Sequence, residues 1–258
     1  MATVTSYKPG NFSWCELVTS DQAAAKSFYS KVFGWDINDS PMGPDQFYTM
    51  LEIGGKPVGA LYGMDKAQMD RGIPPHWNVY VSVTNVDEST KKAASLGGQI
   101  LMEPFDVMEH GRMSIVKDPT GGMICLWQPV KFPGASLVGE NGAFCWWELY
   151  TNDIEGAKKF YTSLFGWTTG GDANYAEWKN SDGVSIGGMM QIQKEWGEVP
   201  PHWMSYVMVA DCDKTAELAK SLGAQVFVGP QDIPNMGRFA VLDDPQHAGF
   251  AIYQMAVK

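Results

Sequence analysis

The stretch WCELVTSDQAAAKSFYSKVFGW at residues 14–35 occurs a second time in the chain, as WWELYTNDIEGAKKFYTSLFGW at residues 146–167. The two stretches are identical at 12 of 22 positions. A second pair, residues 74–128 and 200–254, is identical at 20 of 55 positions and contains PPHW, SLG, Gly-Arg and Asp-Pro twice. Internal repetition of this length predicts two homologous halves.

Each half contains the same order of expected elements. Residues 12–19 alternate in the manner of a strand, and Asp21 and Gly34 have the residue types that begin and end a helix. Extended segments follow, and the order of strand, helix and three strands starts again at residue 76. We place the two domains and the linker between them at residues 8–129, 130–141 (linker) and 142–257.

Charge and composition exclude several classes of function. The chain has 258 residues, with 19 basic and 29 acidic residues and a net charge of −10, which argues against nucleic acid or an anionic membrane as a partner. No apolar run approaches the roughly 20 residues that span a bilayer, and the first residues do not have the pattern of a signal peptide. The four cysteines lie far apart in the sequence. A cytoplasmic protein with reduced thiols is expected.

The repeated motifs resemble those of the vicinal oxygen chelate superfamily, which contains glyoxalase I, bleomycin-resistance proteins and extradiol dioxygenases. The matching residues are Asp21, Ala25, Phe28-Tyr29, Phe33-Gly34-Trp35, Gly111-Arg112 and Asp118-Pro119, with their partners in the second half. The tandem arrangement is similar to the actinobacterial 27 kDa antigen group. The resemblance implies an α+β fold, in which four βαβββ modules pair into two glyoxalase-like domains with curled, cup-shaped mixed sheets.

The resemblance also implies positions for a divalent metal. Carried over to this sequence, they are Trp14 and Trp146, Asn78 and Met204, Cys125 and Ala251, and, with an uncertain register, Leu61 and Met189. Most of these side chains do not bind Mg, Mn, Fe or Ni. We therefore expect no metal site and no cofactor; the alternative is a divalent metal such as Ni, Zn, Mn or Fe.

The candidate catalytic residues are a carboxylate and an imidazole in each half, namely Glu16, His76, Glu148 and His202. Each Glu lies two positions after Trp14 or Trp146, on the same face of its strand. A Glu and a His in one cavity could act as an acid–base pair or as two metal ligands. In the alternative interpretation, the glutamates are buried partners of Arg112 and Arg238, and each His begins a strand and bonds the backbone. Asp118 and Asp244 are expected to cap turns.

The candidate ligand-binding residues are mainly aromatic. Indoles on strands could form a slot for flat molecules, with polar or adaptable neighbours. The expected residues are Trp14, Trp77, Asn78, Cys125, Trp146, Trp203 and Met204. The alternative is that the indoles simply fill the cups.

The favoured function is metal-independent binding of a small hydrophobic or aromatic metabolite in one or both cups, as in bleomycin-resistance proteins. One alternative is an enzyme: a glyoxalase-like lyase or isomerase, or an extradiol-type dioxygenase. Another is a protein-interaction scaffold with filled cups. The expected partner is a small molecule, and the expected assembly is a competent monomer, with a homodimer as the alternative.

Overall fold

The computed structural model describes residues 3–44, 46–171 and 175–256, and it contains the repeated element order. In the first half the first module comprises β1 (Phe12–Thr19), α1 (Gln22–Phe33), β2 (Asp36–Gly43), β3 (Gln46–Ile53) and β4 (Lys56–Gly63). The second module comprises β5 (His76–Ser82), α3 (Val86–Ser95), β6 (Gln99–Val107), β7 (Gly111–Lys117) and β8 (Met123–Pro129). The short helix α2 (Lys66–Asp70) connects them.

The second half repeats this order. Its first module comprises β9 (Phe144–Thr151), α4 (Ile154–Phe165), β10 (Thr168–Gly171), β11 (Ala176–Lys179) and β12 (Ser185–Gln191). Its second module comprises β13 (His202–Met208), α5 (Cys212–Ser221), β14 (Gln225–Ile233), β15 (Gly237–Asp243) and β16 (Gly249–Met255). A 3-10 turn, η1 (Lys194–Trp196), takes the place of α2. The prediction of an α+β fold from four βαβββ modules is therefore confirmed.

Each half forms one mixed sheet of eight strands. The strand orders are β2-β3-β4-β1-β5-β8-β7-β6 and β10-β11-β12-β9-β13-β16-β15-β14. Strands β1 and β5 meet antiparallel at the centre of the first sheet, and each pairs on its other side with a parallel strand, β4 or β8. The centre of each sheet is thus built from both modules of one half.

The first helix of each half begins and ends as its sequence predicts. Asp21 accepts a hydrogen bond from the backbone N–H of Ala24, and Asp153 caps α4 through Gly156. Gly34 and Gly166 end these helices at φ values of 71° and 72°, in the left-handed region that glycine adopts without strain.

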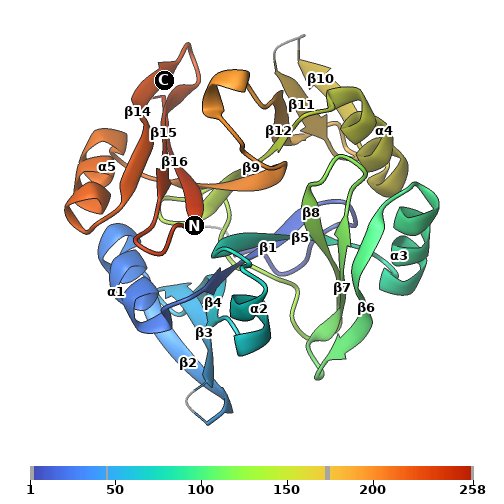
Figure 1. Ribbon diagram of the computed structural model, residues 1–258, viewed down its shortest axis with the longest axis horizontal. Helices are drawn as coiled ribbons and strands as arrows, with labels where there is room; N and C mark the ends of the chain where they lie inside the picture. Colours follow the sequence, from blue (N-terminus) through green and yellow to red (C-terminus); the bar gives the residue numbers. More distant parts are fainter. Residues whose placement is uncertain (1–2, 45, 172–174, 257–258) are drawn as a thin grey trace.

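One hydrophobic core runs through both halves. Helix α1 lies beside α5, and α3 beside α4 (Figure 1). The core contains helical side chains of both halves together with the strand residues that face the helices. Across the junction, the ring of Phe12 stacks on Trp147 with centroids 4.7 Å apart, and Phe28 packs edge-on against Phe250. The halves therefore share a core.

Two equivalent hydrogen bonds join the halves inside this core. Tyr29 on α1 donates to the Asp244 carboxylate at 3.0 Å, and Tyr161 on α4 donates to Asp118 at 2.6 Å. The other oxygen of Asp118 accepts backbone N–H groups from residues 120–122. The prediction that Asp118 and Asp244 cap turns is confirmed, and each also anchors the first helix of the other half.

The expected linker, residues 130–141, lies between the end of β8 and the start of β9. The expected end of the second domain, residue 257, lies outside the described residues, and the domain boundaries stay predictions. Within the described ranges, no helix is long and apolar enough to cross a membrane.

Removing these phenol groups should destabilise the whole molecule. We expect Tyr29→Phe and Tyr161→Phe each to lower the free energy of unfolding by about 1–3 kcal/mol, because each change leaves a buried carboxylate oxygen and an indole N–H without a partner. Urea unfolding followed by circular dichroism measures this loss. Tyr62→Phe, at a partly exposed phenol of β4 away from this junction, is the matched control. Losses no larger than that of the control would contradict the argument.

Candidate functional site

The face of the first sheet turned away from the helices carries a buried carboxyl group. Glu16 lies at the middle of β1, in register with Ala60 of β4 and Asn78 of β5, and is 7% exposed. Its carboxyl accepts hydrogen bonds from Tyr48 at 2.7 Å and from Tyr80 at 2.8 Å. The indole N–H of Trp14 in turn donates to the Tyr48 hydroxyl at 3.2 Å. We call Trp14, Glu16, Tyr48, Tyr80, Asn78 and Cys125 the first site.

The second sheet repeats this arrangement. Glu148 is 5% exposed and accepts from Tyr175 at 2.8 Å and from Tyr206 at 3.1 Å. The indole of Trp146 donates to Tyr175 at 2.9 Å. A further phenol, Tyr150, lies 3.2 Å from the Tyr206 hydroxyl. We call Trp146, Glu148, Tyr175, Tyr206, Met204 and Ala251 the second site.

Both carboxyl groups have a raised pKa. Burial disfavours the carboxylate and raises the pKa of Glu16 and Glu148, while the phenol hydrogen bonds oppose the rise. Burial and the neighbouring carboxyl also raise the pKa of Tyr80 and Tyr206. Each site therefore holds an acid that keeps its proton to a higher pH than an exposed glutamate does, next to phenols whose pKa is also raised. Such a group can donate a hydrogen bond to a ligand or exchange a proton with it.

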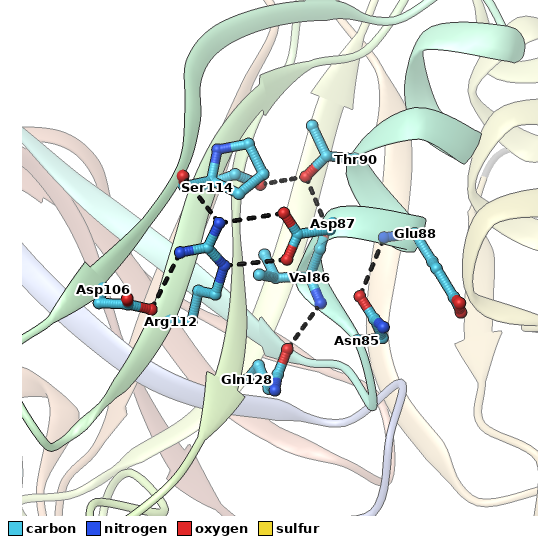
Figure 2. Close-up of polar contacts among 10 residues, drawn as sticks. Asn85, Val86, Asp87, Glu88, Thr90, Asp106, Arg112, Ser114 and Gln128 are labelled. Atoms are coloured by element: carbon cyan, nitrogen blue, oxygen red, sulfur yellow. Dashed lines mark hydrogen bonds and ion pairs between the residues drawn. The ribbon is translucent and has the colours of Figure 1, made fainter.

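The alternative that the glutamates pair with arginines is wrong. Arg112 donates two hydrogen bonds to Asp87, at 2.9 and 3.0 Å, and one to Asp106 at 2.9 Å. Figure 2 shows this arrangement. Arg238 binds Asp213 and Asp232 in the same way. These arginines hold the β6–β7 and β14–β15 hairpins to the helices α3 and α5. The repeated Gly-Arg motif is structural, because a side chain at Gly111 would overlap the Trp127 ring.

The histidines lie at the start of their strands, as the simpler interpretation predicted. The Nδ1 atoms of His76 and His202 lie 2.8 Å from the carbonyl oxygens of Pro74 and Pro200. Burial lowers the pKa of both imidazoles, so the neutral form is favoured. His76 is in register with Val18, which lies two residues along β1 from Glu16 and on the same face of the sheet. The acid–base pairing of Glu and His stays a prediction.

Trp77 and Trp203 do not line the sites, contrary to the sequence-based expectation. His76 and Asn78 face away from the helices, and the side chain between them must point to the other face of the strand. Trp77 accordingly belongs to the shared core and donates to the Tyr29 hydroxyl, and Trp203 donates to Tyr161. Leu61 and Met189 also lie in that core. By contrast, Trp14, Cys125, Trp146 and Met204 pack on the faces that carry the glutamates.

The tyrosines of the sites were missed by the sequence analysis. Tyr80 and Tyr206 had a signal, because both stand four residues after the His of PPHW. Tyr48 and Tyr175 had no such signal. They lie between the two repeated blocks, where the difference in residue number between equivalent positions changes and the copies cannot be aligned directly.

A family model describing the Glyoxalase/Bleomycin resistance protein/Dioxygenase superfamily matches residues 11–126 and 144–252. The chain belongs to this superfamily. The sequence is 40% identical over 258 residues to the Mycobacterium tuberculosis protein named "Putative glyoxylase CFP32", covering 98% of this chain and 97% of that one. It is 32% identical over 271 residues to "Anthracycline biosynthesis protein DauV" of Streptomyces sp. (strain C5), with 98% and 96% coverage.

Solved structures show the same fold. The Mn(II)-bound glyoxalase from Novosphingobium aromaticivorans superimposes with a TM-score of 0.66 at 14% identity, over 96% of this chain and 82% of that chain. The 2,3-dioxygenase LapB from Pseudomonas sp. KL28 gives 0.65 at 14% identity, over 97% and 94%. These TM-scores show that the three chains share a fold.

The superfamily implies a divalent metal, and the side chains here do not fit one. Beside Glu16 lie two phenols, an indole, an amide and the Cys125 thiol, whose pKa burial raises well above its usual range. Beside Glu148, Met204 and Ala251 take the places of Asn78 and Cys125. Within the described residues, no three His, Cys, Asp or Glu side chains gather where they could hold an ion. One carboxyl per site falls short of the three or four ligands that such a metal needs.

The raised pKa values predict how stability changes with pH. A carboxyl group with a raised pKa in the folded state contributes stability below its unfolded pKa, and this contribution is lost as the pH rises through the folded pKa. Glutamine mimics the neutral acid at every pH. We therefore expect the double variant Glu16→Gln, Glu148→Gln to gain stability relative to the unaltered chain as the pH rises above the ordinary glutamate pKa.

Urea unfolding at several pH values measures this difference. Glu103→Gln, at an exposed position of β6, is the matched control and is measured at the same pH values. A difference for the double variant that does not change with pH would mean that the buried groups ionise without penalty.

Proposed function

We propose that this glyoxalase-superfamily protein binds a small aromatic molecule on the helix-free face of a sheet without using a divalent metal. The observation that carries the proposal is the repeated Trp–Tyr–Glu–Tyr hydrogen-bonded group. In both halves this group lies where a metal-using relative would need several metal-binding side chains.

The chemistry of this group defines the ligand class. A neutral carboxyl and a phenol can each donate to a carbonyl oxygen or accept from a hydroxyl group. The indoles and neighbouring methionines offer surface to a flat ring system. The ligand is thus a planar, conjugated molecule with carbonyl or hydroxyl groups on one edge. The name of the Streptomyces relative, which refers to anthracycline biosynthesis, supports an aromatic ligand.

A second candidate function is a glyoxalase-like lyase or isomerase. The observation that favours it is the raised pKa of Glu16 and Glu148, because a carboxyl titrating nearer neutrality is suited to general acid–base chemistry. In this case the carboxyl would move a proton on the bound molecule, and binding would be the first step of the reaction.

Binding without metal is testable with a probe of the stated class. We expect 1,8-dihydroxyanthraquinone to quench the tryptophan fluorescence with a Kd of roughly micromolar order or tighter. Treatment with EDTA should leave this Kd unchanged, and elemental analysis should find no stoichiometric metal. Absence of binding would overturn the proposal, and so would stoichiometric Ni, Zn, Mn or Fe whose removal abolishes binding.

We also propose that a monomer is sufficient for binding. This is supported by the origin of the site residues, since each site takes its described side chains from the two modules of one half. Light scattering during titration should show the monomer mass with and without the probe. Binding that occurs only at concentrations where a dimer forms would contradict this expectation.

A further inference from the structure

The two sites differ in what covers their tryptophan. In the first site, the chain that follows β8 crosses the face of the sheet. The Phe132 ring packs edge-on against Trp14, with centroids 4.9 Å apart and an interplanar angle of 88°. The Phe132 carbonyl accepts from the Trp127 indole at 3.0 Å, and the Ala135 N–H donates to the Ser13 carbonyl at 2.8 Å. As a result Trp14 is only 4% exposed.

The equivalent face of the second half has no such cover among the described residues. Trp146 and Cys145 are partly exposed, whereas their counterparts Trp14 and Ser13 are buried. Within the described part of the chain, no aromatic ring packs against Trp146. At the offset of this repeat, the counterpart of Phe132 is Lys258, which has no ring and lies outside the described residues.

The residues that hold the cover in place also differ. Trp127, which donates to the Phe132 carbonyl, is replaced by Tyr253 in the second half. The Tyr253 hydroxyl instead donates to the carbonyl of Met236 at 2.6 Å. Partly buried apolar side chains remain on this face, including Phe239, Val241 and Tyr253. The second face therefore presents apolar surface around a partly exposed indole.

Two positions next to the carboxyl group are also less polar in the second site than in the first. Opposite Glu16 lies Asn78, whose buried side-chain oxygen has no hydrogen-bond partner among the described residues, and opposite Glu148 lies Met204. Cys125 in the first sheet corresponds to the smaller Ala251 in the second. A thioether and a methyl group favour contact with a ring, while Glu148 and its phenols supply the polar edge.

We infer that the second site is the ligand-binding site, and that Phe132 occupies in the first site the place that the aromatic ring of the ligand takes over Trp146. The inference rests on the proposed function and specifies which half of the chain binds the ligand. The ligand lies with its ring against Trp146 and its carbonyl or hydroxyl edge toward Tyr175 and Glu148. The first site is closed by the chain's own aromatic side chain.

Stoichiometry distinguishes the two sites. Calorimetric titration with 1,8-dihydroxyanthraquinone should give one equivalent bound to the unaltered chain. Phe132→Ala should uncover Trp14 and raise the number of equivalents to two. The matched control is Phe227→Ala, which removes a ring that is 56% exposed on β14 and should leave one equivalent. Two equivalents for the unaltered chain, or one for Phe132→Ala, would overturn the inference.

A second measurement locates the ligand on the chain and does not require that Phe132→Ala folds. With 5-fluorotryptophan incorporated, 19F resonances of Trp14 and Trp146 can be assigned from Trp14→Phe and Trp146→Phe. The probe should shift the Trp146 resonance and leave that of Trp14 in place, and Trp146→Phe should weaken binding by about threefold to tenfold. Binding that shifts Trp14 alone would overturn the inference while the proposed function stands. Absence of all binding would overturn both.

Discussion

The hydrogen bond between the first helix of each half and the aspartate turn of the other half is the constraint on which the arrangement depends. It is formed twice, by Tyr29 with Asp244 and by Tyr161 with Asp118, inside a core that both halves share. A buried carboxylate oxygen without a donor is unfavourable, so the second oxygen of each aspartate depends on the phenol of the other half. The faces of the two sheets that carry the helices are buried in the shared core. A ligand can therefore contact only the opposite faces.

Much of this fold could be predicted from the sequence because the strongest signals are local and repeated. Alternation at 12–19, the Asp21 cap and the Gly34 terminus each reflect a backbone requirement that a single segment meets. Strand β2 gave no such signal. All its residues are exposed at a sheet edge, and DINDSPMG contains mostly residues that strands disfavour, so its pairing with β3 comes from tertiary context alone.

The site was less predictable because it depends on which neighbours meet across strands. Trp14 and Glu16 could be placed on one face from their spacing, and the structure bears this out. Trp77 lies between His76 and Asn78 on β5, so alternation along the strand excludes it from the face that those two residues share. The partners of Arg112 come from α3 and β6, and Tyr48 reaches Glu16 from β3. Strand order and register decide such contacts between side chains of different elements. A motif within one segment carries no information about them.

The two buried glutamates show how duplication allows one framework to hold different sites. In each half the carboxyl is satisfied by two phenols, so it can be retained in the interior whether or not a ligand is present. The two sites differ in the segment that packs on the tryptophan. The Phe132 ring covers Trp14, whereas Trp146 is partly exposed. A closed copy then contributes mainly packing to the shared core. The open copy has the same polar group with an indole that can still gain contact area, and this difference in unburied aromatic surface favours binding there.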